Sequence, residues 1–173
     1  MEIKRITENG LNIVFQIADD GDVRLLHFSA IPFDEKLLGG EDVLRFYRLY
    51  EFQVTGCGRQ ENHGLRYMQN CPGISMKFRE LRDTSAGPGR RLELVTVSTE
   101  LGLEINSVFQ FYQGQPLVRC WQEVRNLGDE SQGLEYLSSF SLTGISKEGL
   151  LDDEDKMRLY IPHNGWQEEL QWK

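Results

Sequence analysis

Apolar and polar side chains alternate between Arg91 and Ile145, and this period of two residues restricts the fold more than any other feature. The alternation is clearest in Leu92–Ser98 and Leu103–Phe111, and it is typical of strands that bury one face. The segment Glu100-Leu101-Gly102 between them is short and contains glycine. The sequence therefore predicts a β-hairpin here.

Two further strands are predicted after this hairpin, at Leu117–Val124 and Leu134–Leu142. The break at Gln113–Pro116 is a turn signal, so the third strand should run antiparallel to the second. Asn126–Glu130 should end the third strand. We expect these four neighbouring strands to form one sheet.

The first thirty residues repeat the pattern in Ile3–Ile6, Leu11–Ile17 and Val23–Phe28. The turn residues Asn9-Gly10 and Asp19–Asp22 separate these three strand candidates.

Other segments are predicted to be loops. Gly56–Gly64 and Arg82–Arg90 are rich in polar and turn residues, and Asp34–Tyr50 fits no period and should be loop with one short element. No helical pattern of eight or more residues is present. Two packed sheets are the simplest way to bury the alternating faces, so the predicted fold class is all-β, an antiparallel β-sandwich.

Composition narrows the functional classes. The 173 residues fit one domain, and a net charge of −8 leaves no basic patch for nucleic acid. No apolar run is long enough to cross a membrane, and the segment Met1–Arg5 does not begin a secretory signal. Three cysteines, Cys57, Cys71 and Cys120, are expected as free thiols in a cytoplasmic protein.

Cys57, His63 and Cys71 are the first candidates for a metal or nucleophilic site, because they lie within fifteen positions of each other. Their spacing matches no zinc template, and no predicted helix end lowers the pKa of a thiol. We expect a polar loop with a buried thiol, and neither a metal nor a cofactor.

Asp152–Asp155 is the densest acidic run. A glycosidase needs two carboxyl groups on opposite sides of a sugar, one of them against an apolar wall. Adjacent acids give neither this separation nor an apolar wall, so we interpret the run as a solvated loop. The run also lacks the residue spacing of a calcium-binding loop.

Aromatic side chains next to polar groups are the third candidate site, because they are typical of sugar-binding surfaces. Trp121 lies within an alternating strand and is predicted to be a core anchor. Trp166 and Trp172 follow the predicted strands and should meet another surface. We expect Trp166 to pack back on the sandwich and Trp172 to stay more exposed.

The central strands resemble the N-terminal domain of α-galactosidases of glycoside hydrolase family 36. The resemblance covers about two thirds of the chain and is carried by these segments: Phe109–Tyr112, Pro116–Asn126, Gly133–Ile145, Asn62-His63-Gly64, Pro72-Gly73, Arg82-Asp83 and Ile161–Trp166.

The resemblance implies a supersandwich of the galactose-mutarotase type, followed in the family by a (β/α)8 barrel that hydrolyses terminal α-galactosides with retention. The catalytic aspartates belong to the barrel, and no barrel pattern follows Lys173, so no catalytic residue is predicted in this chain. Residues 1–160 would form the sandwich, and 161–173 would begin the linker towards the barrel.

The resemblance also implies site residues and partners. In oligomeric members a loop of this domain borders a neighbour's pocket, a role that would fall on Asn62, His63 and Arg66. His163, Trp166 and Trp172 are expected to contact other parts of the enzyme. The partners would be the enzyme's own barrel and, in a homo-oligomer, a second copy.

Three functions remain open. The first is a packing and assembly domain of an α-galactosidase, inactive by itself. The second is a carbohydrate-binding module with its own affinity for oligosaccharides, which should expose aromatic side chains on a sheet face. The third is a similar domain that precedes a different glycosidase barrel.

Overall fold

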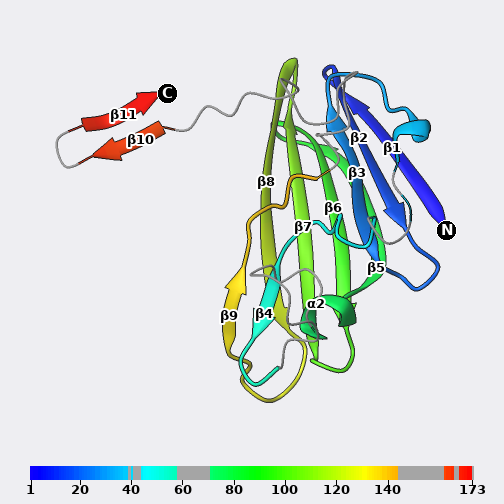
Figure 1. Ribbon diagram of the computed structural model, residues 1–173, viewed down its shortest axis with the longest axis vertical. Helices are drawn as coiled ribbons and strands as arrows, with labels where there is room; N and C mark the ends of the chain where they lie inside the picture. The colour runs from blue at the N-terminus through cyan, green and yellow to red at the C-terminus, as the bar shows by residue number, and fades with distance from the viewer. Residues whose placement is uncertain (39, 41–43, 58–70, 144–161, 166–167, 173) are drawn as a thin grey trace.

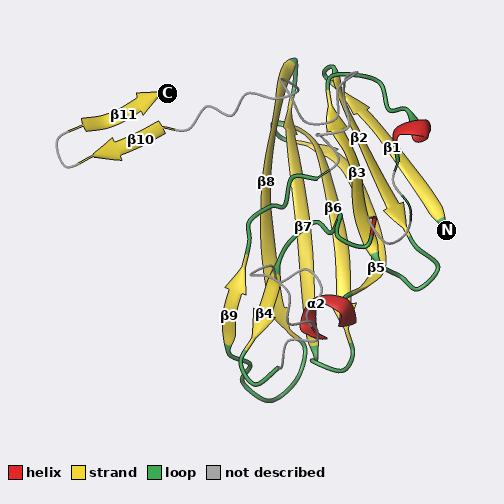
Figure 2. Ribbon diagram, viewed as in Figure 1, coloured by secondary structure: helices red, strands yellow, loops and turns green. Residues whose placement is uncertain are grey.

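The computed structural model describes residues 1–38, 40, 44–57, 71–143, 162–165 and 168–172. Strands make up most of these residues, and the helical segments named in them are short, a 3-10 turn η1 (Glu35–Leu37) and the helix α2 (Cys71–Ser75) (Figure 2). Among the described residues, no helix has the length and apolar character that crossing a bilayer requires.

The largest sheet has the order β5-β6-β7-β8, with every neighbouring pair antiparallel. Its strands are β5 (Lys77–Ala86), β6 (Gly89–Ser98), β7 (Leu103–Tyr112) and β8 (Gln115–Asn126). Consecutive strands are neighbours, so the predicted meander through β6, β7 and β8 is confirmed.

A second meander, β1-β2-β3, forms from the predicted N-terminal strands. It consists of β1 (Glu2–Glu8), β2 (Leu11–Ile17) and β3 (Val23–Ser29). Glu8 pairs with Leu11, so Asn9 and Gly10 form a two-residue turn. Their φ angles are 48° and 85°, as the tight hairpin turns that match the twist of the strands require.

Strand β4 (Phe52–Val54) pairs antiparallel with β9 (Leu134–Leu137), which lies about eighty residues later in the chain. A hairpin of β10 (Pro162–Gly165) and β11 (Glu168–Trp172) occupies the segment predicted to begin the linker.

The sheets form two layers around one core (Figure 1). The β5–β8 sheet is one layer, and the β1–β3 sheet and the β4–β9 pair lie side by side over its inner face. Buried side chains of both layers form the main cluster, including Phe15, Leu25, Phe52, Ile105 and Phe109. The predicted all-β sandwich is therefore confirmed.

A smaller cluster lies on the other face of the β1–β3 sheet. Val14, Leu26 and Leu44 are its buried members, and Phe33 and Tyr47 from the segment after β3 pack against it. This segment therefore covers the β1–β3 sheet on its outside.

Two predictions about elements are wrong. Leu134–Leu142 does not continue the central sheet, because β9 covers only its first residues and pairs with β4. Arg82–Arg90 is not a long loop, because β5 runs through Ala86 and β6 begins at Gly89. Only Gly87 and Pro88 form the turn between these strands.

Candidate functional site

Most of the predicted site residues cannot be placed. Asn62, His63, Arg66 and Trp166 lie outside the described residues, as does the acidic run 152–155. His163 is opposite Gln171, and Trp172 is opposite Pro162, in the β10–β11 hairpin. Only the backbone of this hairpin is described, so the expected contacts of these residues stay predictions.

Trp121 is not a core anchor. It is opposite Val108 in β7, whereas the neighbouring Cys120 is opposite Phe109 and packs against the core. Side chains alternate between the two faces of a strand, so Trp121 lies on the outer face of the β5–β8 sheet, where it is half-buried. The prediction failed because apolar residues occur at both parities in β8.

The Trp121 ring has polar neighbours. The guanidinium carbons of Arg91 and Arg119 lie 5.3 and 5.4 Å from the ring centroid, a distance typical of cation–π pairs. Trp121 Nε1 donates to Glu123 Oε1 over 2.9 Å. Val108, directly opposite, is only 1% exposed although it lies on the outer face. These long side chains therefore shield the outer face.

Asn106 connects this network across the sheet. Its Nδ2 donates to Glu93 Oε1 over 2.9 Å and to Glu123 Oε2 over 3.0 Å. Arg91 Nη2 lies 3.2 Å from Glu93 Oε1 and 3.5 Å from Glu123 Oε1. The two carboxylates therefore share an amide and one guanidinium, which compensates half of their formal charge.

Apolar side chains are exposed along the edge strands β8 and β9, and Leu117 and Val124 have opposite parities in β8, so the exposure is not confined to one face. We call these residues the β8–β9 edge surface: Leu117 and Val124 of β8, Leu127 just after it, and Leu134 and Tyr136 of β9, which are 40 to 56% exposed. In the described part of the chain, β8 is the last strand of its sheet, and β9 pairs with β4 alone. Within the described residues, β8 therefore has a strand partner on one edge only, and so does the short strand β9.

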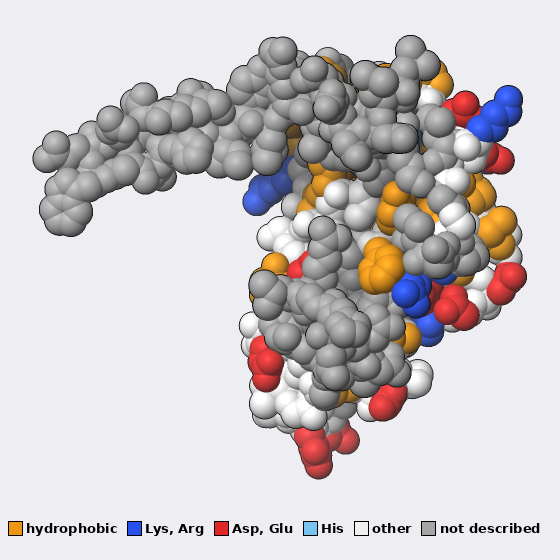
Figure 3. All heavy atoms as spheres, viewed as in Figure 1, with side chains coloured by type: hydrophobic (Ala, Val, Ile, Leu, Met, Phe, Trp, Pro, Cys, Tyr) orange, Lys and Arg blue, Asp and Glu red, His pale blue; other side chains and the backbone are white. Residues whose placement is uncertain are grey.

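The two edges lie on the same side of the molecule. Gln122 Nε2 on β8 donates to Ser139 O just after β9, over 3.1 Å, and Asn126 Nδ2 donates to Glu130 O over 2.7 Å. Figure 1 shows β8 and β9 along the left side of the sandwich. In Figure 3, acidic side chains gather at the lower end of the view.

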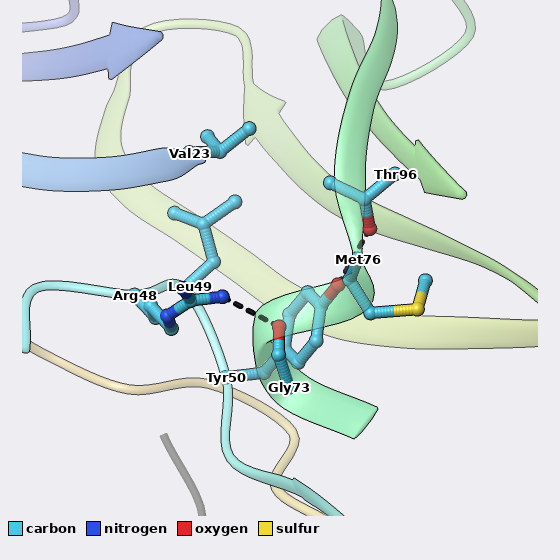
Figure 4. Close-up of a pocket in the computed structure, with 7 residues that line it drawn as sticks. All are labelled: Val23, Arg48, Leu49, Tyr50, Gly73, Met76 and Thr96. Atoms are coloured by element: carbon cyan, nitrogen blue, oxygen red, sulfur yellow. Dashed lines mark hydrogen bonds between the residues drawn. The ribbon is translucent and has the colours of Figure 1, made fainter. Parts of the chain in front are cut away.

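A small interior pocket lies between the layers, beside α2 (Figure 4). Arg48 Nη1 donates to Gly73 O, 2.5 Å away, and Tyr50 Oη lies 2.5 Å from Thr96 Oγ1. The cavity volume is about 10 Å³, the space of one water molecule. This pocket is too small for a substrate, and its polar groups serve the fold.

The two described cysteine side chains give no sign of a nucleophilic site. Cys57 and Cys120 form no disulfide. Burial raises the pKa of the Cys120 thiol to about 12, so the thiol is neutral at physiological pH. His63 and the Cys71 side chain are not described; within the described residues, no group of three or more His, Cys, Asp or Glu side chains is placed to hold a metal ion.

Comparisons with known proteins returned no family model, no curated protein and no solved structure that matches the chain.

Proposed function

We propose that the chain is a non-catalytic N-terminal β-sandwich domain of a larger cytoplasmic α-galactosidase of the family 36 type, with a role in domain packing and assembly. The observation that carries the proposal is the β8–β9 edge surface. Strand edges without a neighbouring strand, next to half-exposed apolar side chains, are typical of surfaces that bind another domain or protein. The sequence resemblance of β7, β8 and β9 names the enzyme class.

The chemistry of this surface fits a protein partner. Leu117, Leu134 and Tyr136 supply apolar contact area, and the exposed Arg119 and Arg125 on β8 supply a polar rim. Apolar centres with polar rims are the usual anatomy of domain and protein interfaces. The partner that follows from the resemblance is the enzyme's own (β/α)8 barrel.

Three described carboxyl groups have lowered pKa values, the opposite of what a glycosidase acid needs. A glycosidase acid needs a raised pKa, which an apolar wall provides. The carboxyl groups with shifted pKa values are Asp20, Glu80 and Asp83, and hydrogen bonds or nearby cations lower each pKa. These groups are suited to ion pairing.

Binding to a catalytic barrel tests the proposal. The pure chain should bind the separately expressed barrel of a family 36 α-galactosidase in calorimetry, and Leu134→Asp/Tyr136→Asp should weaken binding at least tenfold, because two charges would be buried unpaired. Ile31→Asp is the matched control, since Ile31 is equally exposed but lies in the loop after β3.

Three outcomes would contradict the proposal. These are equal binding by both variants, no binding by the unaltered chain, and turnover of a nitrophenyl α-galactoside by the pure chain. Self-association that the double variant abolishes would assign the edge surface to a second copy instead of the barrel.

A carbohydrate-binding module is the second candidate, and the position of Trp121 favours it. An indole on a sheet face is a common platform for the apolar face of a sugar. Arg91 and Arg119 lie beside this ring, so a sugar would have to share the ring with them. Loss of oligosaccharide binding in Trp121→Ala, with folding intact, would support this function over the first.

A further inference from the structure

Three hairpin turns meet at one end of the sandwich. The β1–β2 turn contacts the β7–β8 hairpin through Asn9 Nδ2, which donates to Tyr112 O over 2.8 Å. The β5–β6 turn contacts the same hairpin through a backbone hydrogen bond of 2.9 Å from Gln113 N–H to Pro88 O. Hydrogen bonds between different hairpins fix the turns relative to one another.

The β5–β6 turn approaches β7 so closely that only glycine fits. Gly89 has a φ of +153°, and a Cβ atom there would lie 2.7 Å from Phe111 O. Gly87 has a φ of +64°, and a Cβ atom there would meet nothing within 4 Å. The turn therefore has one packed glycine and one that borders open space.

Arg90 is held in place at this end by two carboxylates. Its Nε and Nη2 donate to Asp83 Oδ1 and Oδ2 over 2.9 and 2.7 Å. Its Nη1 lies 3.3 Å from Glu8 Oε2 on β1. The Arg90 hydrogen bonds hold the pKa of Asp83 below its ordinary value, so the pair stays ionised at neutral pH.

A hollow opens among these turns, with a cavity volume of about 350 Å³, and it is lined by Glu8, Ser85, Gly87, Gly89, Arg90 and Gln113. The same measure gives the interior pocket room for one water molecule, so the hollow has room for a small ligand of many non-hydrogen atoms. Its mouth is open to solvent. In the described part of the chain, the Ser85 hydroxyl and the Gln113 amide form no side-chain hydrogen bonds, so both are available to a ligand.

We propose that this hollow binds a neutral, hydroxyl-rich ligand, a single sugar unit. Two carboxylates and one guanidinium leave this cluster with a formal negative charge, which disfavours an anion, and both carboxylates are already paired with Arg90 and not free to hold a cation. Ser85 and Gln113 each offer a donor and an acceptor, which is what sugar hydroxyls require. The site is separate from Trp121 and goes beyond the packing role.

Galactose titration of the full chain, followed by NMR amide shifts, tests the proposal. The shallow, solvent-open hollow should bind in the millimolar range, with the largest shifts at the amides of Ser85 to Arg90 and of Gln113. Ser85→Ala/Gln113→Ala should weaken binding at least tenfold, because both exposed side chains would lose their hydrogen bonds to the sugar.

Trp121→Ala is the discriminating control and should bind galactose as the unaltered chain does. The proposal is overturned if the turn amides do not shift, if the double alanine variant retains full affinity, or if only Trp121→Ala loses binding. Barrel binding by the double alanine variant should be unchanged, so failure of this proposal and failure of the packing function give different results.

Discussion

Trp121 and Phe109 are both large aromatic residues of the β5–β8 sheet, but their surroundings differ. Phe109 is 1% exposed in the core, where its ring lies 5.2 Å from that of Phe15. Trp121 is half-buried on the outer face among arginine and glutamate side chains. Residue type alone does not distinguish these two cases. The strand periodicity shows which residues share a face of the sheet, but it does not show which face packs against the second layer.

Replacing these two residues by alanine should therefore cost different amounts. Trp121→Ala should lower the free energy of unfolding by about 1–2 kcal/mol, since only part of the ring leaves water on folding. Phe109→Ala should cost about 3–5 kcal/mol, because it leaves a cavity in the core. Urea unfolding of both variants measures the difference, and equal losses would contradict the assignment of Trp121 to the outer face.

At the scale of elements, a buried ion-pair cluster joins segments that are distant in sequence. Asp22, just before β3, accepts from Arg48 Nη2 and from Lys77 Nζ of β5, each over 2.6 Å. Arg48 also donates to Gly73 O of α2. The Asp22 and Arg48 side chains are only 7% and 9% exposed, so water competes little for this pair, whereas Lys77 is 37% exposed.

Removing the acid of this cluster should destabilise the fold strongly. Asp22→Ala leaves the buried Arg48 charge without its carboxylate, which typically costs about 3–5 kcal/mol. The double variant Asp22→Ala/Arg48→Met should recover part of the loss, because no unpaired charge remains. Asp19→Ala is the control, since Asp19 is an exposed acid and should change the urea midpoint little. A double variant no more stable than Asp22→Ala would refute this account.

The sequence predicted β6 and β7 because alternating apolar residues mark the face that each turns to the core. Leu92, Leu94, Ile105 and Phe109 alternate with polar residues and all lie in the core. β5 was missed because it is an edge strand with a polar half, Arg82 to Ser85, that has the composition of a loop. The pairing of β9 with β4 was missed because local pattern carries no information about a partner so far away.

The edge surface could have been anticipated from two signals. Pro116 near the start of β8 is typical of edge strands, since proline cannot donate to a neighbouring strand. Leu117 and Trp121 share one parity in β8, and Val118, Cys120 and Val124 share the other. Apolar residues at both parities indicate a strand with contacts on both faces. The predicted loop residues Asn62, His63 and Arg66 lie outside the described residues, so they stay predictions.

The stability of the whole molecule should fall at alkaline pH. Burial raises the pKa of Cys120 to about 12 and raises the pKa of Tyr50 further above its ordinary value. In the unfolded chain these groups lose their protons near the ordinary values, about 8.5 for a thiol and about 10 for a phenol. At pH values between the pKa of the unfolded chain and the raised pKa of the native state, the unfolded state binds fewer protons than the native state. The free energy of unfolding therefore decreases as pH rises through this range.

Urea midpoints measured from neutral pH upward should therefore decline through this range. Cys120→Ala and Tyr50→Phe should each make the decline shallower, because each removes one proton that the native state retains. Repulsion within a chain of net charge −8 also grows with pH, but both variants keep that contribution. Their slopes therefore isolate the buried groups. Slopes equal to that of the unaltered chain would mean that Cys120 and Tyr50 ionise as readily in the native state as in the unfolded state, against the burial that the sandwich gives them.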